Sequence, residues 1–194
     1  MNRNIQFIAV LFILCFSKDS LSVEPERGTQ SVNQTISVNH VTFSTKTPYE
    51  TFVDKFESQL GHHNISAYQN LLNDPKKTTE VENILHGQEG SSGLMIFAVY
   101  DHGALLMIKS APQKAHQYVI GNPLVAARMT EHNIGAALYA PLRVLVYADS
   151  AGNARAEYDL PTSLFGQFQN EKVTQVAREL DHKLSDLIKK SQVF

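Results

Sequence analysis

The sequence predicts an α+β fold, a two-layer sandwich in which an antiparallel sheet of hairpins is backed by helices. Apolar runs of strand length over 94–100 and 137–148 are each followed by turn residues. The stretch 171–190 instead carries apolar residues at helical spacing. Hairpin signals together with separate helical stretches are typical of two layers packed around one core.

The first residues have the pattern of a secretory signal peptide. A short segment with a positive charge precedes an apolar run over 5–16, which is too short to span a bilayer comfortably. Small residues at Ser20 and Ser22 suit a cleavage site, so we expect a signal peptide over 1–22. The alternative is an uncleaved membrane anchor. Cleavage would leave a secreted or periplasmic protein without a stable membrane span.

One domain is expected after the leader. The chain has 194 residues, of which 43% are hydrophobic and 19% are charged, which is enough for one core. Residues 23–34 are polar and predict a flexible arm, and 35–194 predict a single α+β domain. The single cysteine, Cys15, lies in the leader, so the processed chain would depend on packing rather than on disulfides.

The first half of this domain predicts a strand and several helices. Alternation over 35–45 indicates a strand, and the residues over 48–60 form an amphipathic helical pattern. His62 and His63 then fall in an expected exposed loop, because adjacent side chains diverge and no third metal ligand is near in sequence. Two short helical pieces are expected over 66–85.

Two hairpins and a final helix are expected in the second half. The first hairpin pairs 94–100 with 104–108. The second pairs 137–148 with 154–159. The final helix covers 171–190 and turns its apolar stripe toward the sheet.

Many of the polar residues that have apolar neighbours in the sequence lie at or near the corner between the two hairpins. Gly121 ends a strand, Asn122 suits an N-cap, and Pro123 suits the first position of a helix over 123–132. The free N–H groups after Asn122 would form a small anion site. A ligand site near this corner is therefore predicted.

A helical wheel at about 100° per residue places Arg128 and His132 on one arc with Leu124, Val125 and Met129. We therefore expect Arg128 and His132 to lie on the face that packs against the sheet. A buried guanidinium needs a partner, since an isolated buried charge is costly.

Two interpretations of this pair stay open. In the first, Arg128 pairs internally with Asp101, Glu157 or Asp159, and His132 is a structural histidine. In the second, the two side chains line a cavity between helix and sheet that holds a small anionic or carbonyl-bearing ligand, because Arg binds anions bidentately.

Other side chains complete the candidate set. Arg143 lies in an apolar strand, and Tyr118 could supply a hydroxyl group. The predicted ligand-binding set is Asn122, Arg128, His132, Arg143 and Tyr118. In an alternative, His102 and His132 would ligate a metal or haem in a redox or sensor protein, whose cofactor the sequence leaves unknown.

Several functional classes have no support in the sequence. It contains no nucleophile elbow, no zinc-protease helix motif and no phosphate-binding loop, so binding without catalysis is favoured over an enzyme. The net charge of −2 and the lack of a basic stripe argue against a nucleic-acid partner. A third possibility is a structural homodimer that forms through an exposed sheet edge.

Several blocks of residues point to a known family. They occur in the order Gly93-Leu94-Met95-Ile96-Phe97, Asp101-His102-Gly103-Ala104, Tyr118-Val119-Ile120-Gly121-Asn122-Pro123-Leu124 and Glu157-Tyr158-Asp159-Leu160-Pro161. With the terminal helix, they resemble the domain of unknown function 302 family over most of 43–188. The resemblance implies one α+β domain of the TATA-box-binding-protein-like kind and no established reaction. The region 66–88 departs from the family pattern.

Overall fold

The computed structural model describes residues 31–193. The predicted signal peptide over 1–22 and residues 23–30 of the predicted arm lie outside this part. Thr35–Phe194 forms one compact unit by its internal contacts, and this unit contains the described helices and strands. Among residues 31–193, no helix combines the length and the apolar character needed to cross a membrane.

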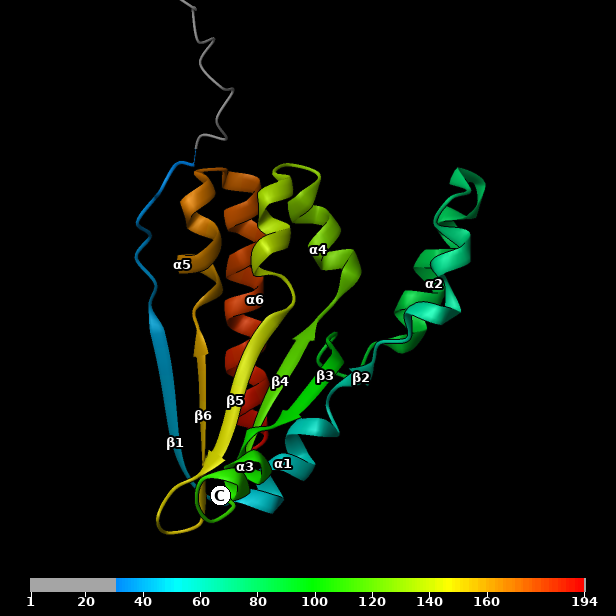
Figure 1. Ribbon diagram of the computed structural model, residues 1–194. Helices are drawn as coiled ribbons and strands as arrows, with labels where there is room; N and C mark the ends of the chain where they lie inside the picture. The colour runs from blue at the N-terminus through cyan, green and yellow to red at the C-terminus, as the bar shows by residue number, and fades with distance from the viewer. Residues whose placement is uncertain (1–30, 194) are drawn as a thin grey trace, which may run out of the picture. The chain divides into compact units, whose positions relative to one another are not determined.

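Six strands form one sheet in the order β1-β6-β5-β4-β3-β2 (Figure 1). They are β1 (His40–Pro48), β2 (Gly61–His62), β3 (Met95–Asp101), β4 (Ala115–Gly121), β5 (Leu142–Ala148) and β6 (Asn153–Asp159). The neighbouring pairs are antiparallel except β2 and β3, which run parallel. The predicted antiparallel sheet thus gains one short parallel edge strand, which the sequence did not suggest.

The described residues also contain six α-helices. They are α1 (Tyr49–Glu57), α2 (Thr78–Gln88), α3 (His102–Leu105), α4 (Pro123–Thr130), α5 (Pro161–Phe165) and α6 (Glu171–Lys190). α6 has the bounds that the sequence predicts, and Asn170 caps it by accepting a hydrogen bond from the backbone N–H of Lys172. α2 and three short 3₁₀ turns form the β2–β3 connection, which covers residues 63–94.

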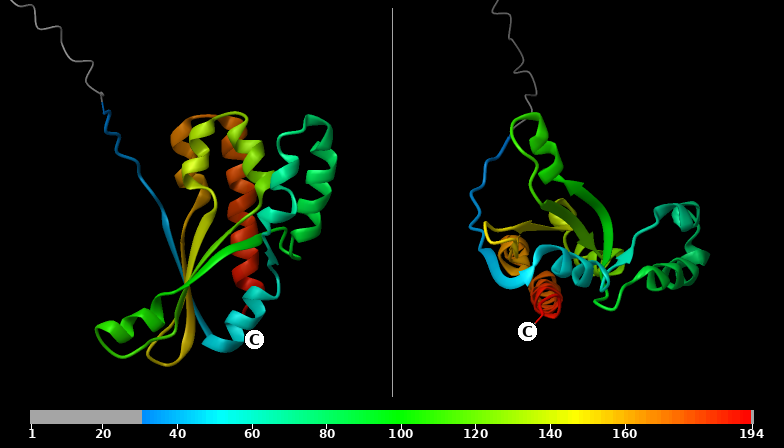
Figure 2. Two further views of the ribbon diagram at one scale, coloured as in Figure 1. Left: turned by 45° about the vertical axis from the view of Figure 1, so that its right-hand side comes forward. Right: turned by 90° about the horizontal axis from the view of Figure 1, so that it is seen from below.

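The core lies between one face of the sheet and the helices α1 and α6 (Figure 2). Side chains alternate between the two faces of a strand. Tyr118 and Ile120 of β4 and Val144 of β5 therefore point inward together, and each is fully buried. α6 adds its predicted apolar stripe, all of it buried: Val173, Val176, Ala177, Leu180, Leu184, Leu187 and Ile188. The predicted α+β two-layer sandwich is confirmed.

The predicted first hairpin is wrong in its second arm. β3 pairs with β4, and the residues over 104–108 are helical, in α3 and a following 3₁₀ turn. Asp101 starts this turn, because its Oδ1 atom accepts a hydrogen bond of 2.8 Å from the backbone N–H of Ala104. Such an N-cap favours helix over strand. We call residues 102–114 the β3–β4 tip, which projects from the sheet in Figure 2.

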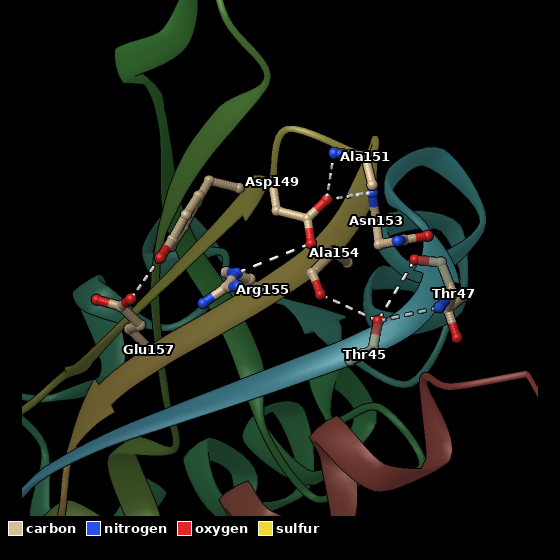
Figure 3. Close-up of polar contacts among 9 residues, drawn as sticks. Thr45, Thr47, Asp149, Ala151, Asn153, Ala154, Arg155 and Glu157 are labelled. Carbon is tan, nitrogen blue, oxygen red and sulfur yellow. Dashed lines mark hydrogen bonds and ion pairs between the residues drawn. The ribbon is translucent and has the colours of Figure 1, made fainter.

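The second hairpin is formed by β5 and β6, and side chains fix its turn and its pairing with β1 (Figure 3). Oδ1 of Asp149 accepts hydrogen bonds from the backbone N–H groups of Ala151 (2.9 Å) and Asn153 (3.0 Å). On β1, the buried hydroxyl of Thr45 donates to the carbonyl of Ala154 at 3.0 Å. The Asp149 contacts fix the turn, and the Thr45 bond helps to hold the edge strand β1 on β6.

Two glycines close the stem of the β2–β3 connection. A Cβ atom on Gly61 would lie 1.8 Å from the carbonyl oxygen of Gln88, and one on Gly90 would lie 2.5 Å from the nitrogen of Gly61. No other residue fits such a close backbone approach. The side chain of Gln88 also accepts from the N–H of Asn64 (2.7 Å) and donates to its carbonyl (3.1 Å). The connection therefore leaves the sheet from a fixed base.

Candidate functional site

A cavity of about 420 Å³ lies at the corner where β4 ends and α4 begins. Its walls come from the sheet end, α4, the β2–β3 connection and the C-terminal helices. They consist of His63, Ile65, Tyr68, Phe97, Gly121, Asn122, Pro123, Val125, Ala126, Ala127, Met129, Thr130, Ala140, Pro141, Leu142, Phe165 and Leu180. Most of these side chains are apolar, and no Lys, Arg, Asp or Glu is among them.

The corner itself has the predicted structure. β4 ends at Gly121, Asn122 is the N-cap of α4, and Pro123 is its first residue. Oδ1 of Asn122 accepts from the backbone N–H of Leu124 at 2.9 Å. Its Nδ2 group donates to Oε1 of Glu89 (2.8 Å) and to the carbonyl of Gly93 (3.0 Å). Asn122 thus lines the cavity, but its amide is already engaged within the protein.

His63 and Tyr68 form a second polar group in the cavity wall. Nε2 of His63 lies 2.7 Å from the hydroxyl oxygen of Tyr68. The imidazole also stacks on Phe97, with the ring centroids 4.1 Å apart. The pairing of β3 with β4 shifts register between Ile96 and Ala98, which leaves Phe97 as the extra residue of a β-bulge. Bulges re-aim side chains, and this one directs Phe97 to the histidine.

Burial favours the uncharged form of both groups. It lowers the pKa of His63 below its ordinary value of 6.5, because desolvation penalises the imidazolium. It also raises the pKa of the Tyr68 phenol, because desolvation penalises the phenolate. At neutral pH the two groups are therefore an uncharged imidazole and an uncharged phenol that share one hydrogen bond.

The pair can still form hydrogen bonds with a ligand. If the Tyr68 hydroxyl donates to Nε2, the imidazole carries its proton on Nδ1, and this N–H can donate to a ligand. If instead Nε2 donates to the hydroxyl oxygen, Nδ1 can accept from a ligand and the phenol O–H can donate to it. The other hydroxyl in the lining, that of Thr130, donates to the carbonyl of Ala126 at 3.1 Å within α4. The cavity therefore combines apolar walls with one neutral donor–acceptor pair.

The predicted inward position of Arg128 is wrong. Arg128 lies on the outer side of α4, where it forms a bidentate ion pair with Glu179 of α6, at 2.8 and 2.9 Å. The predicted partners were Asp101, Glu157 and Asp159. The hydrogen bonds to Glu179 raise the pKa of Arg128 and lower that of Glu179. Ala126 and Thr130 of α4 line the cavity, together with Val125 and Met129 of the predicted arc.

Three further members of the predicted set, His132, Arg143 and Tyr118, do not line the cavity either. His132 follows the end of α4, with Nε2 3.5 Å from Oε1 of Glu131. Arg143 is exposed on β5, on the sheet face opposite the core. The fully buried Tyr118 donates from its hydroxyl to Oε1 of Glu57 at 2.7 Å, and burial raises its pKa. The structure therefore brings only Asn122 of the predicted set to the cavity.

The two histidines of the metal or haem alternative belong to different regions, because α3 and α4 lie at opposite ends of the sheet in Figure 1. His102 is exposed in the β3–β4 tip, and His132 lies beyond the end of α4. Within residues 31–193, no group of three or more His, Cys, Asp or Glu side chains is arranged to hold a metal ion.

Sequence reasoning missed His63 and Tyr68. His63 was expected in an exposed loop, but its backbone N–H continues the β2–β3 pairing with a 3.0 Å bond to the carbonyl of Ile96. The pairing brings it against the sheet and half-buries it. The one sequence feature that points toward this site is the apolar run that contains Phe97. The bulge that directs Phe97 to His63 has no sequence signature.

The chain belongs to the family called Domain of unknown function DUF302, whose model matches residues 73–191. The matched stretch includes Asn122 and the whole of α4, whereas His63 and Tyr68 precede it. No curated protein matches the chain.

A solved structure is similar in fold. It is that of an uncharacterised conserved DUF302 protein from Bacillus stearothermophilus, with a TM-score of 0.54 and 16% sequence identity. The similarity covers 79% of this chain and 98% of that chain. At this level of identity the similarity shows a shared fold.

Proposed function

We propose that the chain binds, without catalysis, a small neutral molecule that is mostly apolar and carries one carbonyl or hydroxyl group. The observation that carries the proposal is the His63–Tyr68 pair in a cavity whose lining has no charged side chain. Because the sequence predicts a signal peptide over 1–22, we propose that this binding takes place outside the cytoplasm, in a secreted or periplasmic protein.

The dimensions and walls of the cavity support this ligand class. Small-molecule sites commonly have volumes of about 300–1,000 Å³ and a few placed polar groups among apolar walls, and a cavity of about 420 Å³ fits that range. The apolar walls would supply most of the affinity by removing ligand surface from water. The His63–Tyr68 pair would select a ligand with a matching polar group.

The contacts of Arg128 and of the first residues of α4 favour a neutral ligand over the anionic ligand that the sequence also allowed. Arg128 is engaged by Glu179 outside the cavity. At the start of α4, Pro123 has no N–H, and the N–H groups of Leu124 and Ala126 already bond to Asn122. An anion in the cavity would therefore lose its hydration without gaining a cation.

Ligand titration tests the proposal. The probes are 2-octanone, 1-octanol and octanoate, measured by thermal unfolding and calorimetry at neutral pH. We expect both neutral probes to raise the unfolding temperature and octanoate to have less effect. Ala126→Phe, which fills the cavity, should abolish the shift. His63→Phe keeps an aromatic ring on Phe97 but removes the hydrogen bond, and should weaken binding about tenfold.

Arg128→Ala is the matched control, because it changes α4 outside the cavity. It should leave the binding of the neutral probes unchanged. A probe whose effect survives Ala126→Phe, or is lost in Arg128→Ala, would contradict the proposed cavity. Haemin is added to the panel for the redox alternative: a Soret band that disappears in His102→Ala or His132→Ala would replace this proposal.

A further inference from the structure

Exposed apolar side chains gather on the β3–β4 tip. The exposed fractions are 58% for Leu105, 70% for Met107 and 71% for Ile108. On the adjoining end of β3, Val99 and Tyr100 are 43% and 53% exposed. Single exposed apolar residues are ordinary, whereas a cluster of this kind marks a contact surface.

The tip is a fixed element, so this exposure is built into the fold. Its start is capped by Asp101, and its two sides meet where the N–H of Gln113 donates to the carbonyl of Gly103 at 3.1 Å. A Cβ atom on Gly103 would lie 2.0 Å from the carbonyl oxygen of Gln113, so the backbones are in direct contact there. Leu106 is half-buried, whereas its neighbours Leu105 and Met107 are exposed.

Within the tip itself, residues 102–114, the Lys, Arg, Asp and Glu side chains have one sign: they are Lys109 and Lys114. The sequence contains no Asp or Glu between Asp101 and Glu131. Lys109 follows the apolar turn directly and forms no ion pair with another described residue. Lys114, at the other side of the tip, pairs with Glu50 at 2.6 Å, and both side chains are exposed. The end of the tip therefore combines protruding apolar side chains with positive charge.

We propose that the β3–β4 tip docks on the surface of an anionic phospholipid bilayer. Leu105, Met107 and Ile108 enter the interfacial region, and Lys109 contacts the negatively charged headgroups. Apolar side chains bordered by lysine are the features by which short helical segments bind in the plane of a membrane. This is peripheral docking by one tip, and it is independent of the ligand cavity.

The charge pattern favours a bilayer over a second copy of the chain. In a two-fold symmetric contact the same patch lies on both sides. A tip-to-tip dimer would therefore bring two Lys109 side chains toward each other with no acidic residue of the tip between them. A bilayer that contains anionic lipid supplies the opposite charge and an apolar layer together.

Vesicle co-sedimentation tests this docking. The processed chain, whose N-terminus is checked by mass spectrometry, is mixed with vesicles of phosphatidylglycerol and phosphatidylcholine in equal parts, or of phosphatidylcholine alone. We expect binding to the anionic vesicles that weakens in high salt. The double variant Met107→Ser and Ile108→Ser should bind about tenfold more weakly or less. Lys109→Glu should remove the preference for the anionic lipid.

The matched control is Ile134→Ser with Leu138→Ser, which removes two apolar side chains of similar exposure, 78% and 81%, from another surface. This control should bind vesicles like the parent, and all variants should unfold at similar temperatures. A parent that ignores the anionic vesicles, or an equal loss in both double variants, would overturn the proposal. Light scattering that shows a dimer converted to a monomer by the tip variant would assign the surface to a second copy instead.

Discussion

The Nδ2 atom of Asn122 lies 2.8 Å from Oε1 of Glu89, so the cap of α4 is joined to the residue that follows α2. The same nitrogen donates to the carbonyl of Gly93, while Oδ1 accepts from Leu124. One buried amide therefore connects α4, the end of α2 and the loop before β3. The β2–β3 connection is held against the cavity partly by this group.

Asn122→Asp separates the capping role from the connecting role. Aspartate caps helices as well as asparagine does, but it has no hydrogen to donate and would place a carboxylate against Glu89. We expect a loss of about 1–3 kcal/mol in the free energy of unfolding, measured by urea denaturation. Asn122→Ser, which keeps a cap and adds no charge, is the control. If Asn122→Asp is as stable as the parent, capping alone explains the residue.

The Arg128–Glu179 pair should contribute little to stability. Both side chains are more than a third exposed, at 47% and 41%, so solvent screens their attraction. Exposed ion pairs contribute about 0–1 kcal/mol, and we expect Arg128→Ala to stay within that range in urea denaturation. A double-mutant cycle with Glu179→Ala isolates the pair. A coupling energy well above that range would mean that the pair carries part of the packing of α4 on α6.

Gly61→Ala and Gly87→Ala form a matched test of the stem of the β2–β3 connection. At Gly61 the new methyl group would collide with the backbone of Gln88, and we expect a loss of about 1–3 kcal/mol in the free energy of unfolding. At Gly87, within α2, it meets no atom within 4 Å and should stabilise the protein by up to about 1 kcal/mol. Equal effects in thermal unfolding would show that the stem opens freely.

The edge strand β1 should depend on pH through His40. Its ring nitrogens lie 3.0 Å from Asp159 and 3.2 Å from Glu157, and these hydrogen bonds, the one to Asp159 first, raise the pKa of His40 above 6.5. Because the folded state holds this proton more tightly, the stabilisation is fully present below pH 6.5 and is lost as pH rises through the raised pKa. The stabilisation is small, because the side chain of His40 is exposed to solvent.

Thermal unfolding of the parent and of His40→Gln at two pH values measures this effect. We expect the parent to be the more stable of the two at about pH 5.5 and the difference to shrink at about pH 8.5. Glu157 stays ionised at the lower pH, because the hydroxyl of Tyr147, 2.6 Å away, helps to hold its pKa below the ordinary 4.5. A difference that grows toward high pH would contradict the assigned sign.

Local signals in the sequence predicted the corner and the last helix well. Asn122 and Pro123 follow Gly121 in the order that begins a helix, and Asn170 precedes an apolar stripe of helical period. Each of these signals acts within a few residues, so it can be interpreted without knowing the partners in space. The same holds for the turn residues after 148, which predicted the hairpin of β5 and β6.

The candidate site could not be predicted in the same way, because its geometry depends on contacts between distant segments. A helical wheel tells which residues of α4 share a face, but it does not tell which face meets the protein. Arg128 lies about 100° from Met129 around the helix, and the packing of α4 buries Met129 while leaving Arg128 at the surface. His63 and Phe97 meet only through the parallel pairing of β2 with β3 and through a bulge.

The closed stem between Gly61 and Gly90 has a consequence for how this protein can change. The two backbones are in direct contact at the stem. The stretch between Gly61 and Gly90 is therefore attached to the sheet by a rigid base. That stretch supplies His63, Ile65 and Tyr68 to the cavity, while the sheet end, α4, the segment before β5 and the C-terminal helices supply the rest. Exchange of the stretch for one of another sequence would therefore alter which molecules the cavity accepts and leave the folding of the sandwich nearly unchanged.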